Sequence, residues 1–290
     1  MSHFSLNCKG RLLSLHQPVV MGILNVTPDS FYDGGRFDQS GQAQADQAAR
    51  LLEEGAAIID IGGASSKPNA KTVSLQEELD RVIPVVEVLA KAHPDAFFSI
   101  DTYRSAVAKA AIEAGVHIIN DISSGQLDDQ MFKTVAELKV PYIGMHMQGT
   151  PDTMQDAPIY EDVVQEVYSG LAQTAYELQA LGLVDIVIDP GFGFGKTVEH
   201  NYEMLARLSE FRFLNRPILV GLSRKSMIYR PLGITPAAAL NGTTALHMAA
   251  LERGANILRV HDVKEAVEAR DLYVAIEAQN PKPLSPVPIP

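Results

Sequence analysis

The sequence predicts a single α/β domain, a (β/α)8 TIM barrel, and three observations support this prediction. Eight short apolar segments alternate along the 290 residues with longer segments of helical periodicity. The short segments are apolar at successive positions, as in strands that are buried on both faces of a parallel sheet. The length is close to the roughly 250 residues typical of such a barrel, and eight strand and helix units favour its closure.

The elements follow one another in a regular order. Strands are expected at residues 19–25, 57–62, 97–101, 117–122, 141–146, 185–190, 217–223 and 256–261. The segments between them have the spacing of amphipathic helices that cover a barrel. These helices are expected at residues 43–54, 75–91, 105–114, 163–181, 201–211, 236–252 and 263–277.

The two ends of the chain differ from this alternation. Residues 4–15 predict a short hairpin with its turn at Cys8, Lys9 and Gly10, which would plug the N-terminal end of the barrel. The last eleven residues contain five of the seventeen prolines, so they cannot form a helix or a strand. We therefore expect one barrel domain over residues 1–280 and an extended Pro-rich tail over residues 281–290.

Charge and composition exclude several classes of partner. The chain is 46% hydrophobic and 20% charged, and its formal net charge is −11. This balance disfavours binding to nucleic acid or to an anionic membrane, so an anionic substrate needs a local cationic pocket. The single cysteine, Cys8, cannot form an intrachain disulfide, and no signal peptide or spanning segment is visible. A cytoplasmic protein is therefore expected.

Polar residues follow every predicted strand, which is where barrel enzymes carry their active sites. They are Asn25, Asp60, Asp101, Asn120, Asp121, His146, Asp189, Ser223, Arg224, Lys225, Arg259 and His261. Any one carboxylate or amide at such a position has capping of the next helix as an equally good explanation. Lys225, Arg259 and His261 are not capping residue types, and with Lys67 they predict a pocket for a phosphorylated substrate.

The remaining polar residues predict a second kind of contact. Asp101, Asn120 and Asp189 supply two carboxylates and an amide, which suit a flat heterocycle with several N–H donors. The loops after the first two strands are rich in Gly, Ser and Pro, and their position over the rim favours mobile lids.

Several motifs suggest other functions, but each lacks a residue that the function requires. GFGFGKT at residues 191–197 lacks the first glycine of a phosphate-binding loop, because that position is Pro190. We interpret it as a turn that brings backbone close to a ligand, with Phe192 and Phe194 packing or lining a pocket. None of the eight histidines forms a zinc motif, and we expect His146 to be a core residue. The serines have no evident relay partner.

Seven segments, in this order, resemble the dihydropteroate synthase family: MGILNVTPDSFYDGG, IDIGGASSKPNA, SIDTYRSAVAKAAIEAG, INDISSG, DPGFGFGK, GLSRKSMI and RVHDV. The resemblance covers the chain except its tail. It implies a (β/α)8 barrel of folate biosynthesis, a target of sulfonamides. Members join 6-hydroxymethyl-7,8-dihydropterin diphosphate to 4-aminobenzoate and release pyrophosphate with the help of Mg²⁺. A dissociative, cation-like step under closed loops is expected, with no strong general base.

The resemblance also assigns roles to residues of this chain. Asn25 and Asp33 would bind Mg²⁺. Asp101, Asn120 and Asp189 would hold the pterin edge, and Lys225 would reach its ring. Arg259 and His261 would clamp the diphosphate, with Lys67 also anchoring it. The aminobenzoate pocket would be framed by Phe31, Ser66, Pro68, Phe194 and Ser223. The residues expected to act in catalysis are Lys225, Arg259, His261 and Asp101.

The second loop departs from the family pattern, which usually reads Glu-Ser-Thr-Arg-Pro where this chain has Ala64-Ser65-Ser66-Lys67-Pro68. Lys67 keeps the charge but loses the bidentate fork of arginine, so weaker diphosphate anchoring is expected. Two rival functions stay open, a pterin-dependent methyltransferase and a catalytically silent pterin-binding homologue. The methyltransferase would not need the cationic residues after the last two strands. The resemblance also suggests a homodimer through helices late in the chain.

Overall fold

Eight parallel strands form the sheet of a nearly closed barrel, in a computed structural model that describes residues 4–26, 42–64, 73–150, 153–154 and 158–279. The strands are β3 (Val19–Asn25), β4 (Ile58–Gly62), β5 (Phe97–Asp101), β6 (Ile118–Asp121), β7 (Tyr142–Met145), β8 (Ile186–Asp189), β9 (Leu219–Val220) and β10 (Ile257–Val260). Their spatial order is β8-β7-β6-β5-β4-β3-β10-β9. A parallel bridge between Ile188 and Ile218 joins the two ends of this order and closes the barrel.

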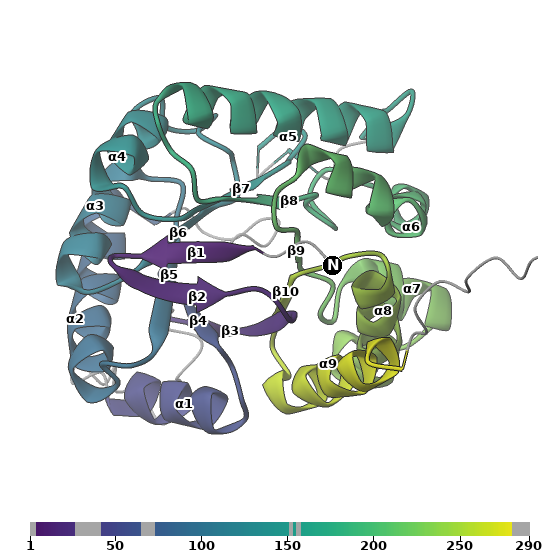
Figure 1. Ribbon diagram of the computed structural model, residues 1–290, viewed down its shortest axis with the longest axis horizontal. Coiled ribbons are helices and arrows are strands. Elements are labelled where there is room, and N and C mark those ends of the chain that lie inside the picture. Colours follow the sequence, from purple (N-terminus) through teal and green to yellow (C-terminus); the bar gives the residue numbers. More distant parts are fainter. Residues whose placement is uncertain (1–3, 27–41, 65–72, 151–152, 155–157, 280–290) are drawn as a thin grey trace, which may run out of the picture.

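Helices cover the outside of the barrel, as Figure 1 shows. They are α1 (Gln42–Glu53), α2 (Leu75–Ala92), α3 (Ser105–Ala114), α4 (Met131–Leu138), α5 (Val163–Ala180), α6 (Val198–Ala206), α7 (Ser226–Leu232), α8 (Leu240–Glu252) and α9 (Val263–Glu277). Two short 3-10 helices, η2 (Leu208–Leu214) and η3 (Pro236–Ala238), complete the set. Within the described ranges, no helix is both long enough and apolar enough to cross a bilayer.

The sequence prediction missed two helices because each is short. α4 has eight residues and buries only Met131 and Val135, one turn apart. α7 has seven residues, contains Pro231 and ends at Gly233 in the left-handed conformation. Two predicted helices also proved discontinuous. The segment expected at 236–252 breaks at Ala239 into η3 and α8, and the one expected at 201–211 splits into α6 and η2.

Strand β9 is shorter than the predicted 217–223. Pro217 has no N–H to donate, and the N–H of Ile218 bonds to the Asn256 side chain at 2.9 Å. At the other end, the N–H of Lys225 bonds to the carbonyl of Leu222, which turns the chain out of the sheet. The barrel is therefore closed by a short strand, through the bond from the N–H of Ile188 to the carbonyl of Pro217.

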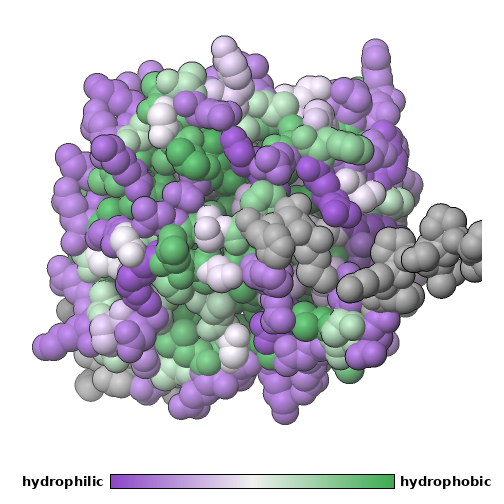
Figure 2. All heavy atoms as spheres, viewed as in Figure 1, coloured by the Kyte–Doolittle hydropathy of each residue, from purple (hydrophilic) through white to green (hydrophobic). Residues whose placement is uncertain are grey.

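A hairpin closes the N-terminal end of the barrel, as predicted. β1 (Ser5–Cys8) pairs with β2 (Arg11–Ser14), and both turn residues have positive φ, 55° at Lys9 and 88° at Gly10. The inward residues Leu6 and Leu13 belong to one apolar cluster with buried interior side chains from seven of the eight barrel strands, and the partly buried Phe97 of β5 packs against it. Figure 1 shows this hairpin lying across the barrel end, and Figure 2 shows the same face in space-filling form, with hydrophilic residues along much of its outline.

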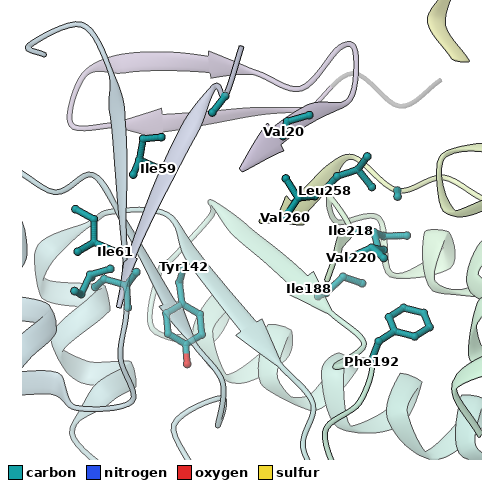
Figure 3. Packing of buried hydrophobic residues seen from close by; sticks show 14 of the residues in the cluster. Val20, Ile59, Ile61, Tyr142, Ile188, Phe192, Ile218, Val220, Leu258 and Val260 are labelled. Carbon is teal, nitrogen blue, oxygen red and sulfur yellow. The ribbon is translucent and has the colours of Figure 1, made fainter. Parts of the chain in front are cut away.

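The main hydrophobic core lies between the strands and the helices. Alternate strand residues point outward into it, and Figure 3 labels several of them, among them Val20, Ile59 and Leu258. The intervening residues point into the barrel, where the apolar layer under the hairpin gives way to polar side chains toward the carboxyl ends of the strands. The packing thus leaves one end of the barrel interior polar.

Candidate active site

The polar strand ends lie side by side because the sheet is in register. β3, β4, β5 and β6 place Asn25, Gly62, Asp101 and Asn120 at successive positions around the rim. The predicted convergence of these residues on one rim is therefore present in the structure. Phe31, Asp33, Ser66, Lys67 and Pro68 lie outside the described residues.

Arg259 is the centre of a buried ionic network. Its Nε is 2.6 Å from Oδ2 of Asp60, and its Nη2 is 2.6 Å from Oδ2 of Asp101. Asn120 donates to the same Asp60 oxygen at 3.0 Å. Burial lowers the pKa of Arg259, but the two carboxylates more than offset this and keep the guanidinium charged. The network fixes the position of Arg259 within the rim.

The two carboxylates of this network differ in environment. Burial raises the pKa of Asp101 to about 7, although Arg259 opposes the shift. Asp60 is fully buried, and its Oδ1 receives no hydrogen bond from the described part of the chain. Asp60 lies at a predicted strand end, but its sequence position alone predicts no role for it. Asp60 lies on the same face of β4 as Ile58 and Gly62, and this face points into the barrel. A carboxylate buried there needs a cationic partner.

Asp189 is presented by β8 at the opposite side of the rim. Its Oδ1 accepts from the N–H of Gly191 at 2.7 Å, and its backbone carbonyl accepts from His146 in the next strand end. No described residue donates to Oδ2, which leaves that oxygen for a ligand. Burial raises the pKa of Asp189, and the nearby Lys225 acts in the opposite direction.

Lys225 reaches the loop that follows β8. Its Nζ donates to the carbonyl of Phe192 and lies 4.6 Å from the centre of the Phe194 ring. Burial lowers the pKa of Lys225 to about 8, while Asp189 raises it. Phe192 is fully buried and packs in the outer core, whereas Phe194 is half-buried beside Lys225. Of the two open interpretations, packing holds for Phe192; Phe194 packs against a small apolar cluster that includes Met145 and Met147, and Lys225 lies over its ring.

Ser223 and His261 form a pair at the ends of β9 and β10. The N–H of His261 donates to Ser223 Oγ at 3.2 Å, and His261 Nδ1 lies 3.0 Å from the same oxygen. If the hydroxyl donates to Nδ1, Nε2 carries the proton and can donate to a ligand. Burial, followed by the charge of Arg259, lowers the pKa of His261 to about 4. The neighbouring Arg224 instead donates to Asp262 through Nε and Nη2, each at 2.8 Å.

Asn25 and Asp101 border a small space above Gly62. A Cβ atom on Gly62 would lie 3.7 Å from Asn25 Oδ1 and 3.8 Å from Asp101 Oδ2. Asn25 Oδ1 is an oxygen donor of the kind that Mg²⁺ binds, with phosphate oxygens and water completing its shell, whereas Asp101 Oδ2 is already paired with Arg259. In the ranges that the structure describes, no group of three or more His, Cys, Asp or Glu side chains could hold a metal alone.

One buried residue of this region was not predicted. Lys196 is only 3% exposed, and its Nζ lies within hydrogen-bond distance of the carbonyls of Gly191 and Phe194 and of His146 Nδ1. The sequence showed it only as the lysine of an incomplete phosphate-loop pattern. His146, expected to be a core residue, is half-buried and holds its ring nitrogen toward Lys196.

Known proteins match this chain along most of its length. A family model described as "Pterin binding enzyme" matches residues 21–261. Dihydropteroate synthase of Escherichia coli strain K12 is 47% identical over 263 residues, which cover 90% of this chain and 92% of that protein. Dihydropteroate synthase of Haemophilus influenzae is 45% identical over 260 residues, 89% of this chain and 94% of that one.

Solved structures agree with the family match. Xanthomonas albilineans dihydropteroate synthase with 4-aminobenzoic acid has a TM-score of 0.88 and 43% identity, covering 94% of this chain and 98% of that chain. The same enzyme in complex with 7,8-dihydropteroate has a TM-score of 0.85 and 41% identity, covering 95% and 99%. A sulfonamide complex of the Yersinia pestis enzyme has a TM-score of 0.88 and 44% identity, covering 95% and 100%. The chain therefore belongs to the pterin binding enzymes, within the dihydropteroate synthase family.

Proposed function

We propose that this chain is a folate-synthesis transferase that condenses 6-hydroxymethyl-7,8-dihydropterin diphosphate with 4-aminobenzoate. The products are 7,8-dihydropteroate and pyrophosphate. The observation that carries the proposal is the rim itself, where carboxylates able to accept from a heterocycle lie beside the cations Lys225 and Arg259. The relatives whose structures contain 4-aminobenzoic acid and 7,8-dihydropteroate support the same substrate and product.

Asp189 is the proposed acceptor for the pterin edge. A 2-amino-4-oxo pterin presents adjacent N–H groups, and a buried carboxylate with one oxygen left for a ligand can accept from them. Asn120 and Asp101 are proposed to complete this contact from the facing strands. Because all three side chains are largely buried, a heterocycle without those donors would leave polar groups unpaired and would bind weakly.

Arg259 and His261 are the proposed diphosphate ligands, with Lys67 reaching in from the second loop. Their positive charge and N–H donors stabilise the negative charge that develops as pyrophosphate leaves. A dianion beside His261 favours the protonated imidazole, so its lowered pKa would rise on binding. Asn25 is the proposed protein ligand for Mg²⁺, with Asp33; the ion would neutralise the leaving diphosphate when bound.

The aminobenzoate pocket is proposed to be framed by Phe31, Ser66, Pro68, Phe194 and Ser223. Lys225, whose Nζ lies 4.6 Å from the centre of the Phe194 ring, is proposed to reach the pterin ring beside this pocket. The C–O bond between the exocyclic methylene and the diphosphate breaks, and its electron pair leaves with pyrophosphate. The amine lone pair then forms the C–N bond, and the resulting ammonium loses a proton to solvent. A cation-like methylene conjugated with the dihydropterin ring would favour this order, and exclusion of water would prevent hydrolysis.

The proposal includes a homodimer in the cytoplasm. The late helices α7 and α9 expose Leu232, Leu272 and Ile276, which supports an interface on this side of the barrel. The buried single cysteine, Cys8, is consistent with a reducing compartment. Light scattering of the purified protein would give the oligomeric state.

Pyrophosphate release tests the proposed reaction directly. The purified chain would be incubated with Mg²⁺, pterin diphosphate and 4-aminobenzoate, with controls that omit one component at a time. We expect release that needs all three components, with dihydropteroate formed in equal amount. Binding of pterin diphosphate without release would instead identify a catalytically silent homologue. Methyl transfer from a methylated pterin would identify the methyltransferase.

A further inference from the structure

We propose that Lys196 is a positioning residue. It holds the loop after β8 from the side that faces β7, and so fixes the conformation of the aminobenzoate side of the active site. This inference rests on the proposed function. The loop, residues 191–195, lies between two lysines. Lys225 contacts it from the rim, through the carbonyl of Phe192 and the ring of Phe194. Lys196 contacts it from the side that faces β7.

The ammonium of Lys196 gathers backbone oxygens from two separate segments. Its Nζ lies 3.0 Å from the carbonyl of Gly191, 2.9 Å from that of Phe194 and 3.3 Å from that of His146, with His146 Nδ1 at 3.2 Å. Three N–H donors therefore face four acceptors in a site that is almost closed to solvent. These contacts join the end of β7 to the loop after β8.

The loop has little freedom on that side, because its backbone lies directly against the segment after β7. A Cβ atom on Gly191 would come within 1.9 Å of the His146 carbonyl, and one on Gly195 within 2.5 Å of the Gln148 carbonyl. Both glycines also have positive φ, 72° and 63°. Close backbone approach turns several carbonyls inward, and a buried cation is the group that can satisfy them together.

Other side chains complete the support for this loop. Tyr160 Oη donates to the carbonyl of Gly195 at 2.8 Å, and Asn201 Oδ1 accepts from the N–H of Gly193 at 2.7 Å. Tyr160 thus acts on the same loop as Lys196 but through a single neutral hydrogen bond. Neither Lys196 nor Tyr160 has an assigned role in binding substrate, so both can be altered without removing a proposed ligand.

The effect of Lys196 should be unequal for the two substrates. The backbone of Asp189, the proposed pterin acceptor, is fixed by pairing with β7, and only the first loop residue touches its carboxylate, through the N–H of Gly191. Phe194, proposed to frame the aminobenzoate pocket, lies inside the segment that Lys196 holds, and its own carbonyl contacts the Lys196 ammonium. Loss of the ammonium should therefore disturb the aminobenzoate side more than the pterin side.

Lys196→Met tests this directly, since methionine has a similar length and no donor. We expect the KM for 4-aminobenzoate to rise about tenfold or more. The Kd for pterin diphosphate, measured by calorimetry, should change less than threefold. Lys133→Met, on the exposed face of α4, is the matched control and should leave both values unchanged. Equal changes in both constants, or no change in either, would overturn the inference.

Tyr160→Phe serves as the second variant if Lys196→Met does not fold. It removes one hydrogen bond to the same loop, so the KM for 4-aminobenzoate should rise about two- to fivefold with the pterin Kd unchanged. An unchanged KM in a folded Tyr160→Phe protein would also count against the inference. If the unaltered chain releases no pyrophosphate, the proposed function has failed. If it turns over and the variants show no unequal effect, only the role of Lys196 has failed.

Discussion

Asp189 combines burial with one bonded and one available carboxylate oxygen. We expect Asp189→Asn to weaken pterin diphosphate binding by about 30- to 150-fold, because a buried charged acceptor contributes on the order of 2–3 kcal/mol. The fold should persist, since an asparagine oxygen can still accept from Gly191. Calorimetric titration measures the change, and Asp129→Asn on the exposed loop before α4 is the control. Binding within threefold of the original would remove Asp189 from the proposed site.

The environment of Asp101 gives a pH-dependent contribution to stability. Its pKa is about 7 in the folded chain against 3.8 for the ordinary carboxyl, so between these values the folded state binds the extra proton. The contribution is full below about pH 4 and is lost as pH rises through 7. Asp101→Asn cannot titrate, so its unfolding free energy should fall less over this range, by up to about 4 kcal/mol. Urea unfolding at several pH values tests this, and parallel curves for the two proteins would contradict it.

Individual site residues were predictable only where the strand position identified them. Asp101, Asn120, Asp189 and Arg259 stand at strand ends, and register alone brings strand ends together. Lys196 was not predictable, because its role depends on carbonyls of the segment after β7, about fifty residues earlier in the chain. A sequence pattern does not show which way a buried lysine turns. The assigned roles of the rim residues stay predictions until variants are measured.

The N-terminal hairpin is an element whose contribution can be separated from the active site. Leu6 and Leu13 are buried under the barrel, whereas Leu12 on the same hairpin is 71% exposed. Leu6→Ala or Leu13→Ala should each reduce the free energy of unfolding by about 2–4 kcal/mol through lost burial and a cavity. Leu12→Ala should change it by less than about 0.5 kcal/mol. Denaturant unfolding measures these values. A similar loss in all three would show that the hairpin is not packed as described.

The loop after the second predicted strand, which departs from the family pattern, gives a prediction about substrate affinity and sulfonamide sensitivity. Replacing Ala64 by Glu and Lys67 by Arg restores the usual family residues, including the bidentate fork for a phosphate group. We expect this double variant to have a lower KM for pterin diphosphate or an altered sulfonamide sensitivity. Steady-state kinetics with and without a sulfonamide test it. Kinetics identical to those of the original chain would refute the proposed effect of the departure.

Element prediction succeeded where a single pattern dominated. The ranges of β3, β5, α3 and α9 match the predicted residues because each has a sustained apolar period. Prediction failed for α4 and α7, where seven or eight residues carry too few apolar positions to show a period. It also overextended β9, because the polar sequence after that strand gives no sign that the chain turns there.

At the scale of the whole molecule, closure of the barrel depends on a narrow seam between β8 and β9. The N–H of Ile188 crosses this seam to the carbonyl of Pro217, and Asn256 holds the next residue, Ile218, from the β10 side, because its side chain accepts from the Ile218 N–H. Asn256→Ala would leave the buried Ile218 N–H unpaired and should cost about 1–3 kcal/mol of unfolding free energy. Thermal and urea unfolding would measure this, with exposed Gln126→Ala as the control. Equal stability of both variants would mean that the seam does not depend on this side chain.

The closed end of the barrel limits how substrates enter and how products leave. Because the hairpin fills one opening, anything bound among the interior polar side chains must arrive and depart through the opposite mouth. In the proposed reaction, the pterin contacts Asp101, Asn120 and Asp189 belong to the strands, whereas most aminobenzoate contacts belong to the loops that follow strands, so the second substrate would stand in the path of the first. Loading is then ordered from the inside outward and unloading from the outside inward. An excess of the outer substrate would slow turnover whenever it occupies the passage before the inner one has entered.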